Sequence, residues 1–148
     1  MKNDKTDNHE QLFWEEIDRL FPDMIKAIAS LSKKSYLSIT NLRTGITWWS
    51  ERAMDYFGMK ENYTIRGMEK ANRKIHPDDV ATFKRGFKER VDGKNLDTAW
   101  EYRIQDGDSY NRFNAMARVL YDEQKQPFII IIRYDNYGIS DEVDSVTG

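Results

Sequence analysis

The sequence predicts an α+β fold in which a five-stranded antiparallel sheet carries short helices on one face and follows an N-terminal helical extension. Two segments near the C-terminus alternate apolar and polar residues, as half-buried strands do, and a continuous apolar run follows them. Two shorter strand-like segments lie nearer the N-terminus, and segments with helical spacing separate the two groups. Strands and helices grouped in this way along a chain are typical of an α+β architecture.

Residues 98–135 are expected to form the last three strands. Apolar residues occupy every second position of the first two: Trp100, Tyr102 and Ile104, then Phe113, Ala115, Ala117, Val119 and Tyr121. Gly107 lies in the polar turn between them, where a positive φ costs glycine nothing. The third strand, 128–132, is apolar at both parities, so both faces of the sheet must be covered there. Central helices supply one cover. The other must come from the N-terminal segment or from a second chain.

The N-terminal segment divides into a tail and a helical part. Residues 1–9 are polar and are predicted to be disordered, whereas residues 10–34 have the spacing of an amphipathic helix. Apolar residues recur there at steps of four and three, which is a heptad pattern: Phe13, Ile17, Leu20, Met24, Ala27 and Leu31. Pro22 interrupts the pattern, and we expect either a kink or a second helix that begins with Pro22.

This helical segment has two possible roles. It can pack on its own domain, or it can form a dimer interface with its counterpart in a second copy. The candidate interface residues are Phe13, Ile17, Leu20, Met24 and Leu31. We predict that part of the apolar stripe covers the sheet of its own chain and part contacts the partner in a homodimer.

A β-hairpin is expected within residues 36–49. Ser50 is placed to cap the short helix that follows, and Gly58 is placed to end it. Residues 59–74 are expected to be irregular, apart from a short helical piece at 68–73.

The longest central helix is expected to begin at Pro77, which suits the first helical position. Asp78 and Asp79 then lie favourably near the positive end of the helix dipole. The predicted buried stripe of this helix comprises Val80, Phe83, Phe87 and Val91.

Composition excludes several classes of function. The 148 residues form one domain by length, and a net charge of −2 gives no basic footprint for nucleic acid. No apolar run approaches the ~20 residues that span a bilayer, and no secretory signal is visible. The chain has no cysteine, which excludes disulfides and thiolate chemistry. We therefore expect a soluble, cytoplasmic protein with no nucleic-acid or membrane partner.

No catalytic or metal-binding set stands out in the sequence. His76 is the only histidine outside the tail, and its neighbours Asp78 and Asp79 are too close in sequence to orient it as a general base. The same three residues form no convincing metal-ligand set, and there is no glycine-rich phosphate loop. We predict that this chain is not an enzyme and binds no metal.

Residues 35–137 resemble a PAS domain of the subgroup that carries a His-Pro-Asp-Asp motif. The matching segments are 42–45, 49–53, 57–58, 76–79 and 101–104, together with Phe113, where the family usually has Trp. Asp135 stands where the family has the aspartate of its closing Asp-Ile-Thr motif, but Asn136 and Tyr137 replace the other two residues. The turn after Asp122 lacks the usual glycine. The resemblance implies a sensory domain whose signal leaves at Asp135.

Cofactors of PAS families can be compared with these residues. The absence of cysteine excludes a cysteine-linked flavin or chromophore. Haem is disfavoured because His76 precedes its helix instead of pointing from it. A small-molecule ligand remains possible, as does no ligand at all. The candidate pocket residues are Phe83, Phe87, Ala115 and Ala117. The two alanines either leave room for a ligand or let the helix approach the sheet closely.

The segment 144–148, Asp-Ser-Val-Thr-Gly, resembles the opening of a GGDEF domain, the catalytic domain of diguanylate cyclases. The resemblance implies that residues 138–148 link the sensory domain to a GGDEF-like output domain, which would make cyclic di-GMP from two GTP. Because two such domains must meet, the sensor could act by setting dimer geometry. Two alternatives stay open. The chain could be a positioning module that binds no ligand, or the sensor of a histidine kinase, which the short linker disfavours.

Overall fold

Six strands form one antiparallel sheet in a computed structural model that describes residues 4–139, with side chains described for 8–66 and 68–139. The strands are β1 (Tyr36–Asn41), β2 (Ile46–Trp49), β3 (Tyr63–Ile65), β4 (Trp100–Asp106), β5 (Ser109–Tyr121) and β6 (Pro127–Ile139). Their order across the sheet is β3-β2-β1-β6-β5-β4. The GGDEF-like segment 144–148 and most of the predicted linker lie outside the described residues.

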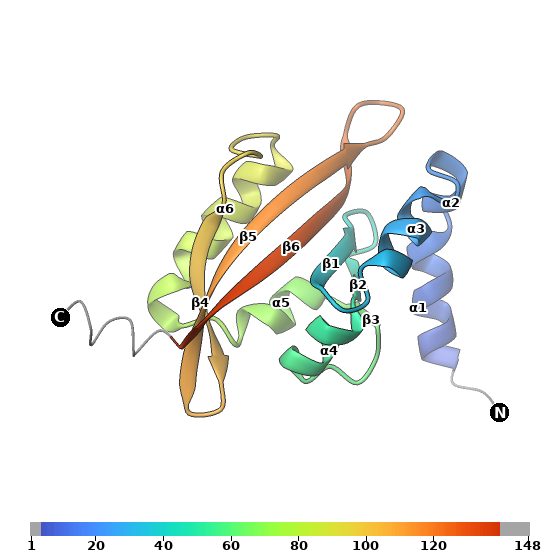
Figure 1. Ribbon diagram of the computed structural model, residues 1–148. Coiled ribbons are helices and arrows are strands. Elements are labelled where there is room, and N and C mark those ends of the chain that lie inside the picture. The colour runs from blue at the N-terminus through green and yellow to red at the C-terminus, as the bar shows by residue number, and fades with distance from the viewer. Residues whose placement is uncertain (1–3, 140–148) are drawn as a thin grey trace.

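The helices form two groups. The first group, here called the cap, comprises α1 (Asp4–Trp14), α2 (Ile17–Leu20) and α3 (Met24–Leu31). The second comprises α4 (Glu51–Phe57), α5 (Gly67–Asn72), a 3-10 turn at Pro77–Asp79, and α6 (Val80–Val91). Figure 1 shows the cap beside β1, β2 and β3, while α6 lies against β4 and β5. The predicted α+β class is confirmed.

The sheet has one strand more than the sequence predicts. β3 pairs with β2 in antiparallel register, with Trp48 opposite Tyr63 and Ile46 opposite Ile65. It lies in the segment that was expected to be irregular. Three residues are too few to show an alternating pattern, so only the pairing with the edge of β2 defines this strand.

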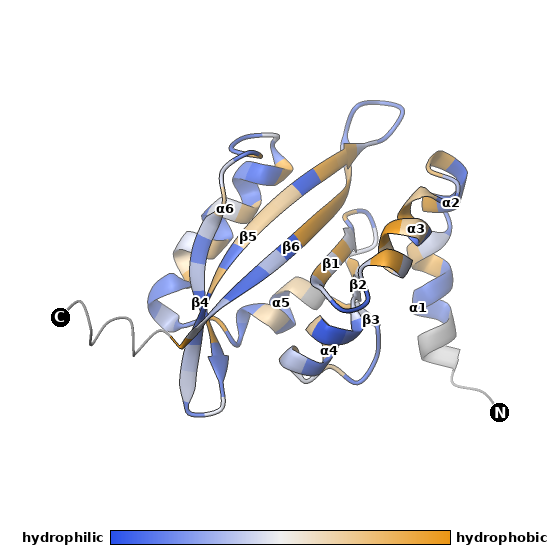
Figure 2. Cartoon of the chain, in the orientation of Figure 1, coloured by the Kyte–Doolittle hydropathy of each residue, from blue (hydrophilic) through white to orange (hydrophobic). Residues whose placement is uncertain are grey.

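The sheet is covered on both faces by two hydrophobic clusters. The core cluster lies between the sheet and α4–α6 and includes Trp49, Phe57, Phe83, Trp100, Tyr102, Phe113, Ile130 and Ile132. The cap cluster lies between the sheet and α1–α3 and includes Phe13, Ile17, Ile25, Leu37, Ile39, Trp48, Phe128 and Ile129. Figure 2 shows hydrophobic residues concentrated in the first half of β6 and in α3. The second cover that β6 requires therefore comes from the N-terminal segment of the same chain.

An irregularity near the start of β6 sets which residues face the cap. Leu120 pairs with Ile129 and Tyr121 pairs with Pro127, so Phe128 is an extra residue on β6. Both Phe128 and Ile129 consequently belong to the cap cluster. Simple alternation would place these neighbours on opposite faces.

The N-terminal helices differ from the predicted single amphipathic segment. α1 begins at Asp4, inside the tail that was expected to be disordered. Pro22 lies in the turn between α2 and α3, and Asp23, with φ 64°, separates it from the first residue of α3. Pro22 therefore does not begin a helix. Because the chain turns twice within the segment, residues seven apart do not stay on one face.

The buried face of α6 also differs from the predicted stripe. Phe83 is buried, but Val80, Phe87 and Val91 are only partly so. Gly86 and Arg90 occupy the buried face instead. A Cβ on Gly86 would lie 3.0 Å from the Trp100 ring, so glycine is what allows α6 to approach β4.

Arg90 is buried under the C-terminal end of α6, although arginine normally lies at the surface. Its guanidinium lies 4.0 Å from the centroid of the Trp100 ring and donates to the Gly86 carbonyl at 3.2 Å and to the Thr98 carbonyl. Burial lowers its pKa, but an arginine stays charged at any physiological pH. The cation–π contact and the two carbonyls compensate the buried charge.

The N-terminal end of α6 is tied to β4 by an ion pair. The carboxylate of Asp79 accepts from Arg103 Nε and Nη2, both at 2.9 Å, and from the Arg103 backbone N–H at 2.8 Å. The Arg103 side chain holds the pKa of Asp79 below its ordinary value. Asp79 thus fixes the helix to the sheet in addition to its expected place near the helix dipole.

Replacement of Phe113 by alanine should lower the free energy of unfolding by about 3–5 kcal/mol, because it opens a cavity in the core cluster. The Phe113 ring is 1% exposed and packs edge-on against Tyr36 and Tyr56 at centroid distances of 5.6 and 5.3 Å. Urea unfolding measures the change. The control Asn114→Ala, on the opposite face of the same strand, should change stability by about 0.5 kcal/mol or less. Equal losses of stability in the two variants would mean that Phe113 does not face the core cluster.

The Asp79→Asn variant should lose stability in a pH-dependent way. The pKa of Asp79 is lowered in the folded state, so its contribution is present above the unfolded pKa of about 3.9 and disappears as pH falls through the folded pKa. We expect urea unfolding to show a deficit of about 1–2 kcal/mol at pH 7 that shrinks towards pH 3. Asp78→Asn, at a side chain that is 80% exposed, is the control. A deficit that persists at pH 3 would assign the effect to the backbone contact instead of the charge.

Candidate functional site

The four residues predicted to line a ligand pocket lie where α6 packs on the sheet. Phe83, Ala115 and Ala117 are buried in the core cluster, and Phe87 is partly buried beside them. Trp100 pairs with Ala115 across β4 and β5, and its ring centroid lies 6.0 Å from that of Phe83. The indole therefore fills the space that the small alanine side chains leave.

A gap beside Phe83 inside the core cluster is too small for a ligand. The gap between Phe57, Ile75, Phe83, Tyr102 and Tyr134 leaves no room for a water molecule. The geometry thus favours the second interpretation of the alanines, which is close approach of α6 to the sheet. A ligand pocket at the four residues stays a prediction.

Two tyrosine hydroxyls lie inside this core. Tyr102 and Tyr134 are 2% and 3% exposed, and burial raises the pKa of both hydroxyls far above the ordinary value. The Tyr134 and Ser38 hydroxyls form a hydrogen bond of 3.0 Å, whereas among the described residues the Tyr102 hydroxyl has no partner. Both phenols are therefore neutral at physiological pH.

The contact between the cap and the sheet combines apolar packing with directional bonds. Phe13 and Ile17 are fully buried, and the Phe13 ring lies 5.5 Å from the Tyr63 ring. Trp14 Nε1 donates to the Tyr63 hydroxyl at 2.9 Å, and Asn41 Nδ2 donates to the Phe13 carbonyl at 3.1 Å. The two hydrogen bonds fix the orientation of α1 over β1 and β3.

Arg43 joins the cap to two turns of the sheet. Its guanidinium is paired with Glu16, directly before α2, and with Asp122, in the β5–β6 turn. It also lies 4.7 Å from the centroid of the Phe128 ring. The Gln126 backbone N–H, together with Arg43 and the Gln124 N–H, lowers the pKa of Asp122. The sequence interpretation treated Arg43 only as a turn residue, because none of its partners is near in sequence.

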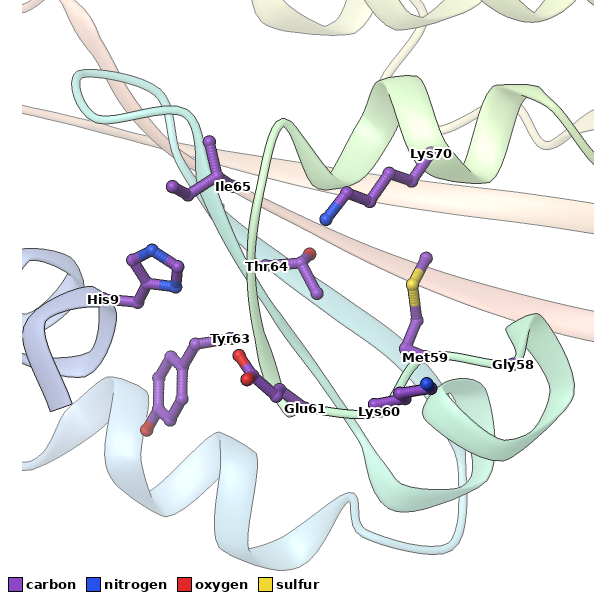
Figure 3. A pocket seen from close by; sticks show the side chains of 9 residues that line it. All are labelled: His9, Gly58, Met59, Lys60, Glu61, Tyr63, Thr64, Ile65 and Lys70. Carbon is purple, nitrogen blue, oxygen red and sulfur yellow. The ribbon is translucent and has the colours of Figure 1, made fainter. Parts of the chain in front are cut away.

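A surface pocket of about 530 Å³ lies beside β3, between α1 and α5 (Figure 3). It is lined by His9 of α1, Gly58, Met59, Lys60 and Glu61 of the loop before β3, Tyr63, Thr64 and Ile65 of β3, and Lys70 of α5. His9 and Tyr63 lie on one side of it, Met59 and Lys70 on the other. Sequence reasoning missed this site because its lining comes from four separate segments.

Asp135, the predicted signal-output residue, lies in the second half of β6. It pairs with Asn114 across the strands and accepts from Arg133 at 3.3 Å. Its side chain is 43% exposed, whereas the preceding Tyr134 is buried. β6 continues past Asp135 to Ile139, two residues into the predicted linker. Asp135 therefore lies at the point where β6 leaves the buried part of the sheet.

The candidate dimer residues are divided between two environments. Phe13 and Ile17 are fully buried in the cap cluster, and Leu20 is partly buried against it. Met24 is 42% exposed and Leu31 is 87% exposed. The buried residues hold the cap on its own sheet, so only Met24 and Leu31 are available for a second copy.

The side chains described at 8–66 and 68–139 contain no cluster of three metal-ligating groups. Nor does any helix within residues 4–139 have the length and apolar composition needed to cross a bilayer. His76 Nδ1 accepts from the Asp78 backbone N–H at 3.1 Å, so this side chain caps the 3-10 turn at Pro77–Asp79.

Comparison with known proteins agrees with this architecture. The family model described as PAS fold matches residues 46–132. No curated protein matches the chain. Among solved structures, a sensory box histidine kinase/response regulator from Burkholderia thailandensis aligns with a TM-score of 0.61 at 16% identity, over 82% of this chain and 89% of that one.

Two further solved structures are similar. The N-terminal domain of a diguanylate cyclase with PAS/PAC sensor from Marinobacter aquaeolei aligns with a TM-score of 0.58 at 15% identity, over 70% of this chain and 95% of that one. The PAS domain from Bordetella pertussis BvgS aligns with a TM-score of 0.55 at 11% identity, over 84% of this chain and 94% of that one. At these identities the likeness shows a shared fold. Since the family match spans more than half of the sequence, the chain belongs to the PAS family of sensory domains.

Proposed function

We propose that this PAS domain passes a signal to a C-terminal diguanylate cyclase domain by setting the geometry of a homodimer, and that the cap is the element that responds. A PAS domain is a sensory module without catalytic chemistry. In this proposal the cap and the sheet change their relative position, and the output domain reads the change. The protein would act in the cytoplasm, where cyclic di-GMP is made from GTP.

One observation carries this proposal: β6 belongs to both clusters and also leads to the C-terminal segment. Phe128 and Ile129 pack under the cap, while Ile130 and Ile132 pack in the core cluster. The same 13-residue strand ends at Ile139, two residues into the predicted linker. A displacement of the cap therefore acts on the strand that leads to the output domain.

The choice of a cyclase as output has two supports. Residues 144–148 resemble the opening of a GGDEF domain. The similar Marinobacter aquaeolei structure is described as the N-terminal domain of a diguanylate cyclase. The short segment between β6 and residue 144 leaves little length for a coiled coil between the two domains.

A histidine kinase sensor is the second candidate, because the similar Burkholderia thailandensis structure is described as a sensory box histidine kinase. The filled core cluster also favours a domain that positions its output without a ligand in the core. Both alternatives keep the role of β6. The kinase alternative changes the output domain, and the alternative without a core ligand changes the input signal. Assignment to the His-Pro-Asp-Asp subgroup stays a prediction.

The Leu31→Asp and Met24→Asp variants should dissociate the homodimer and leave the fold intact. Leu31 is 87% exposed and Met24 42%, so neither contributes much to the cap cluster, whereas a charge in an apolar interface has a high desolvation cost. Sedimentation velocity measures the dimer, and thermal unfolding checks the fold. Ser30→Asp, also exposed on α3, is the matched control and should remain dimeric. Variants that stay dimeric would place the interface elsewhere, and a monomeric wild type would remove the dimer mechanism.

The full-length protein encoded by the gene should convert GTP to cyclic di-GMP, and Leu31→Asp should lower that rate. The rate should fall because two GTP-loaded domains must meet and the variant separates them. Chromatography of the nucleotide products measures the reaction, with Ser30→Asp again as the control. Transfer of the γ-phosphate of ATP to a histidine, without any cyclic di-GMP, would select the kinase instead.

A further inference from the structure

We propose that the surface pocket between α1, β3 and α5 binds a small organic monocarboxylate with an apolar body, and that binding holds α1 of the cap on the sheet. The pocket has a volume of about 530 Å³, which lies within the range of small-molecule sites. It lies at the surface, with Met59 between it and the core cluster, and is distinct from the gap beside Phe83, which is too small for water. This site adds a ligand to the signalling role proposed above, and that role can hold without it.

The charge of the lining selects an anion. Lys60 and Lys70 supply two positive charges and Glu61 one negative charge, so the pocket is locally cationic in a chain whose net charge is −2. Among the side chains that the structure describes, at 8–66 and 68–139, neither lysine forms an ion pair. Figure 3 shows the Lys70 side chain extending towards Thr64, into the pocket. Two lysines opposed by one carboxylate match a singly charged ligand better than a phosphate, which favours the forked donors of arginine.

Uncharged donors lie around the same space. The Tyr63 hydroxyl accepts from Trp14 Nε1 at 2.9 Å, so its own proton is free to donate. The Thr64 hydroxyl accepts from Trp49 Nε1 at 2.7 Å and has a free proton in the same way. His9 Nδ1 is buried and, among the described residues, has no hydrogen-bond partner. A ligand carboxylate offers these groups the acceptors that they lack.

The rest of the lining is apolar. Met59 and Ile65 line the pocket, and Ile65 is 45% exposed although its backbone is part of the sheet. An apolar body attached to the carboxylate would remove this surface from water. The pocket therefore fits an amphiphilic monoanion better than a small inorganic anion.

The two sides of the pocket belong to different parts of the fold. His9 comes from α1 of the cap, whereas Lys60, Thr64 and Lys70 belong to the sheet side and α5. A ligand in contact with both sides binds the docked cap in preference to the released one. It therefore shifts the population towards the docked form.

The test uses benzoate as the probe and the full 148-residue chain. Benzoate should shift the NMR signals of His9, Thr64, Ile65 and the Met59 methyl group, with a dissociation constant on the order of 1 mM. Benzamide has the same shape without the charge and should bind about fivefold more weakly or worse. Lys70→Met should weaken the binding of benzoate by a similar factor, whereas Lys84→Met, at an exposed position of α6, should leave that binding unchanged.

Amide hydrogen exchange tests the effect on the cap. Benzoate should slow exchange in residues 10–14 of α1 in the wild type and should do so less in Lys70→Met. The site would be overturned by any of three results: no NMR shift at about 10 mM benzoate, equal weakening of benzoate binding by Lys70→Met and Lys84→Met, or benzamide binding as tightly as benzoate. Binding without slower exchange in α1 would overturn the link to the cap. The sedimentation and cyclic di-GMP experiments contain no probe, so their outcome is independent of this one.

Discussion

The first half of β6 is apolar on both faces, and the rest of the fold depends on covering it twice. Ile130 and Ile132 need the core cluster, while Phe128 and Ile129 need the cap cluster. A sheet with one cover would leave a row of isoleucines in water, at a cost of roughly 25 cal/mol for each Å² of apolar surface. The N-terminal cap is therefore part of the folded domain, and any movement of the cap changes the environment of β6.

Three arginines hold the covering helices in place, and the positive charge of each is compensated by different groups. Arg43 bridges two carboxylates that belong to the cap and to the β5–β6 turn. Arg103 forms a bidentate pair with Asp79 and fixes the start of α6. Arg90 is buried at the other end of α6, where the Trp100 ring and backbone carbonyls surround its guanidinium and the Glu89 carboxylate lies 3.6 Å away. Directional contacts of this kind select one orientation for each helix, which apolar packing alone does not.

The aromatic packing of the core bears on how the domain could sense. Trp100 occupies the place beside Ala115, and Gly86 lets α6 close over it. Ligand space is found instead at the junction of the cap and β3, where side chains from separate segments meet around the pocket of Figure 3. A signal that enters at this junction lies close to the cap contacts and reaches β6 through them, without opening the core. In the proposed function, the C-terminal end of β6, where Asp135 is 43% exposed, would follow the position of the cap.

The sequence alone determined the class of fold, five of the six strands, the capped helix after Ser50 and the need for a second cover on β6. These features follow from local periodicity and from backbone preferences of serine, glycine and proline, which act over a few residues. Only the tertiary structure decided that the cap of the same chain supplies the cover, that β3 pairs with β2, and that Arg90 is buried. It also decided which heptad residues are exposed, since Asp23 and the turns around α2 break the helix that would align them. Each of these depends on contacts between residues far apart in sequence, and no local pattern encodes such contacts.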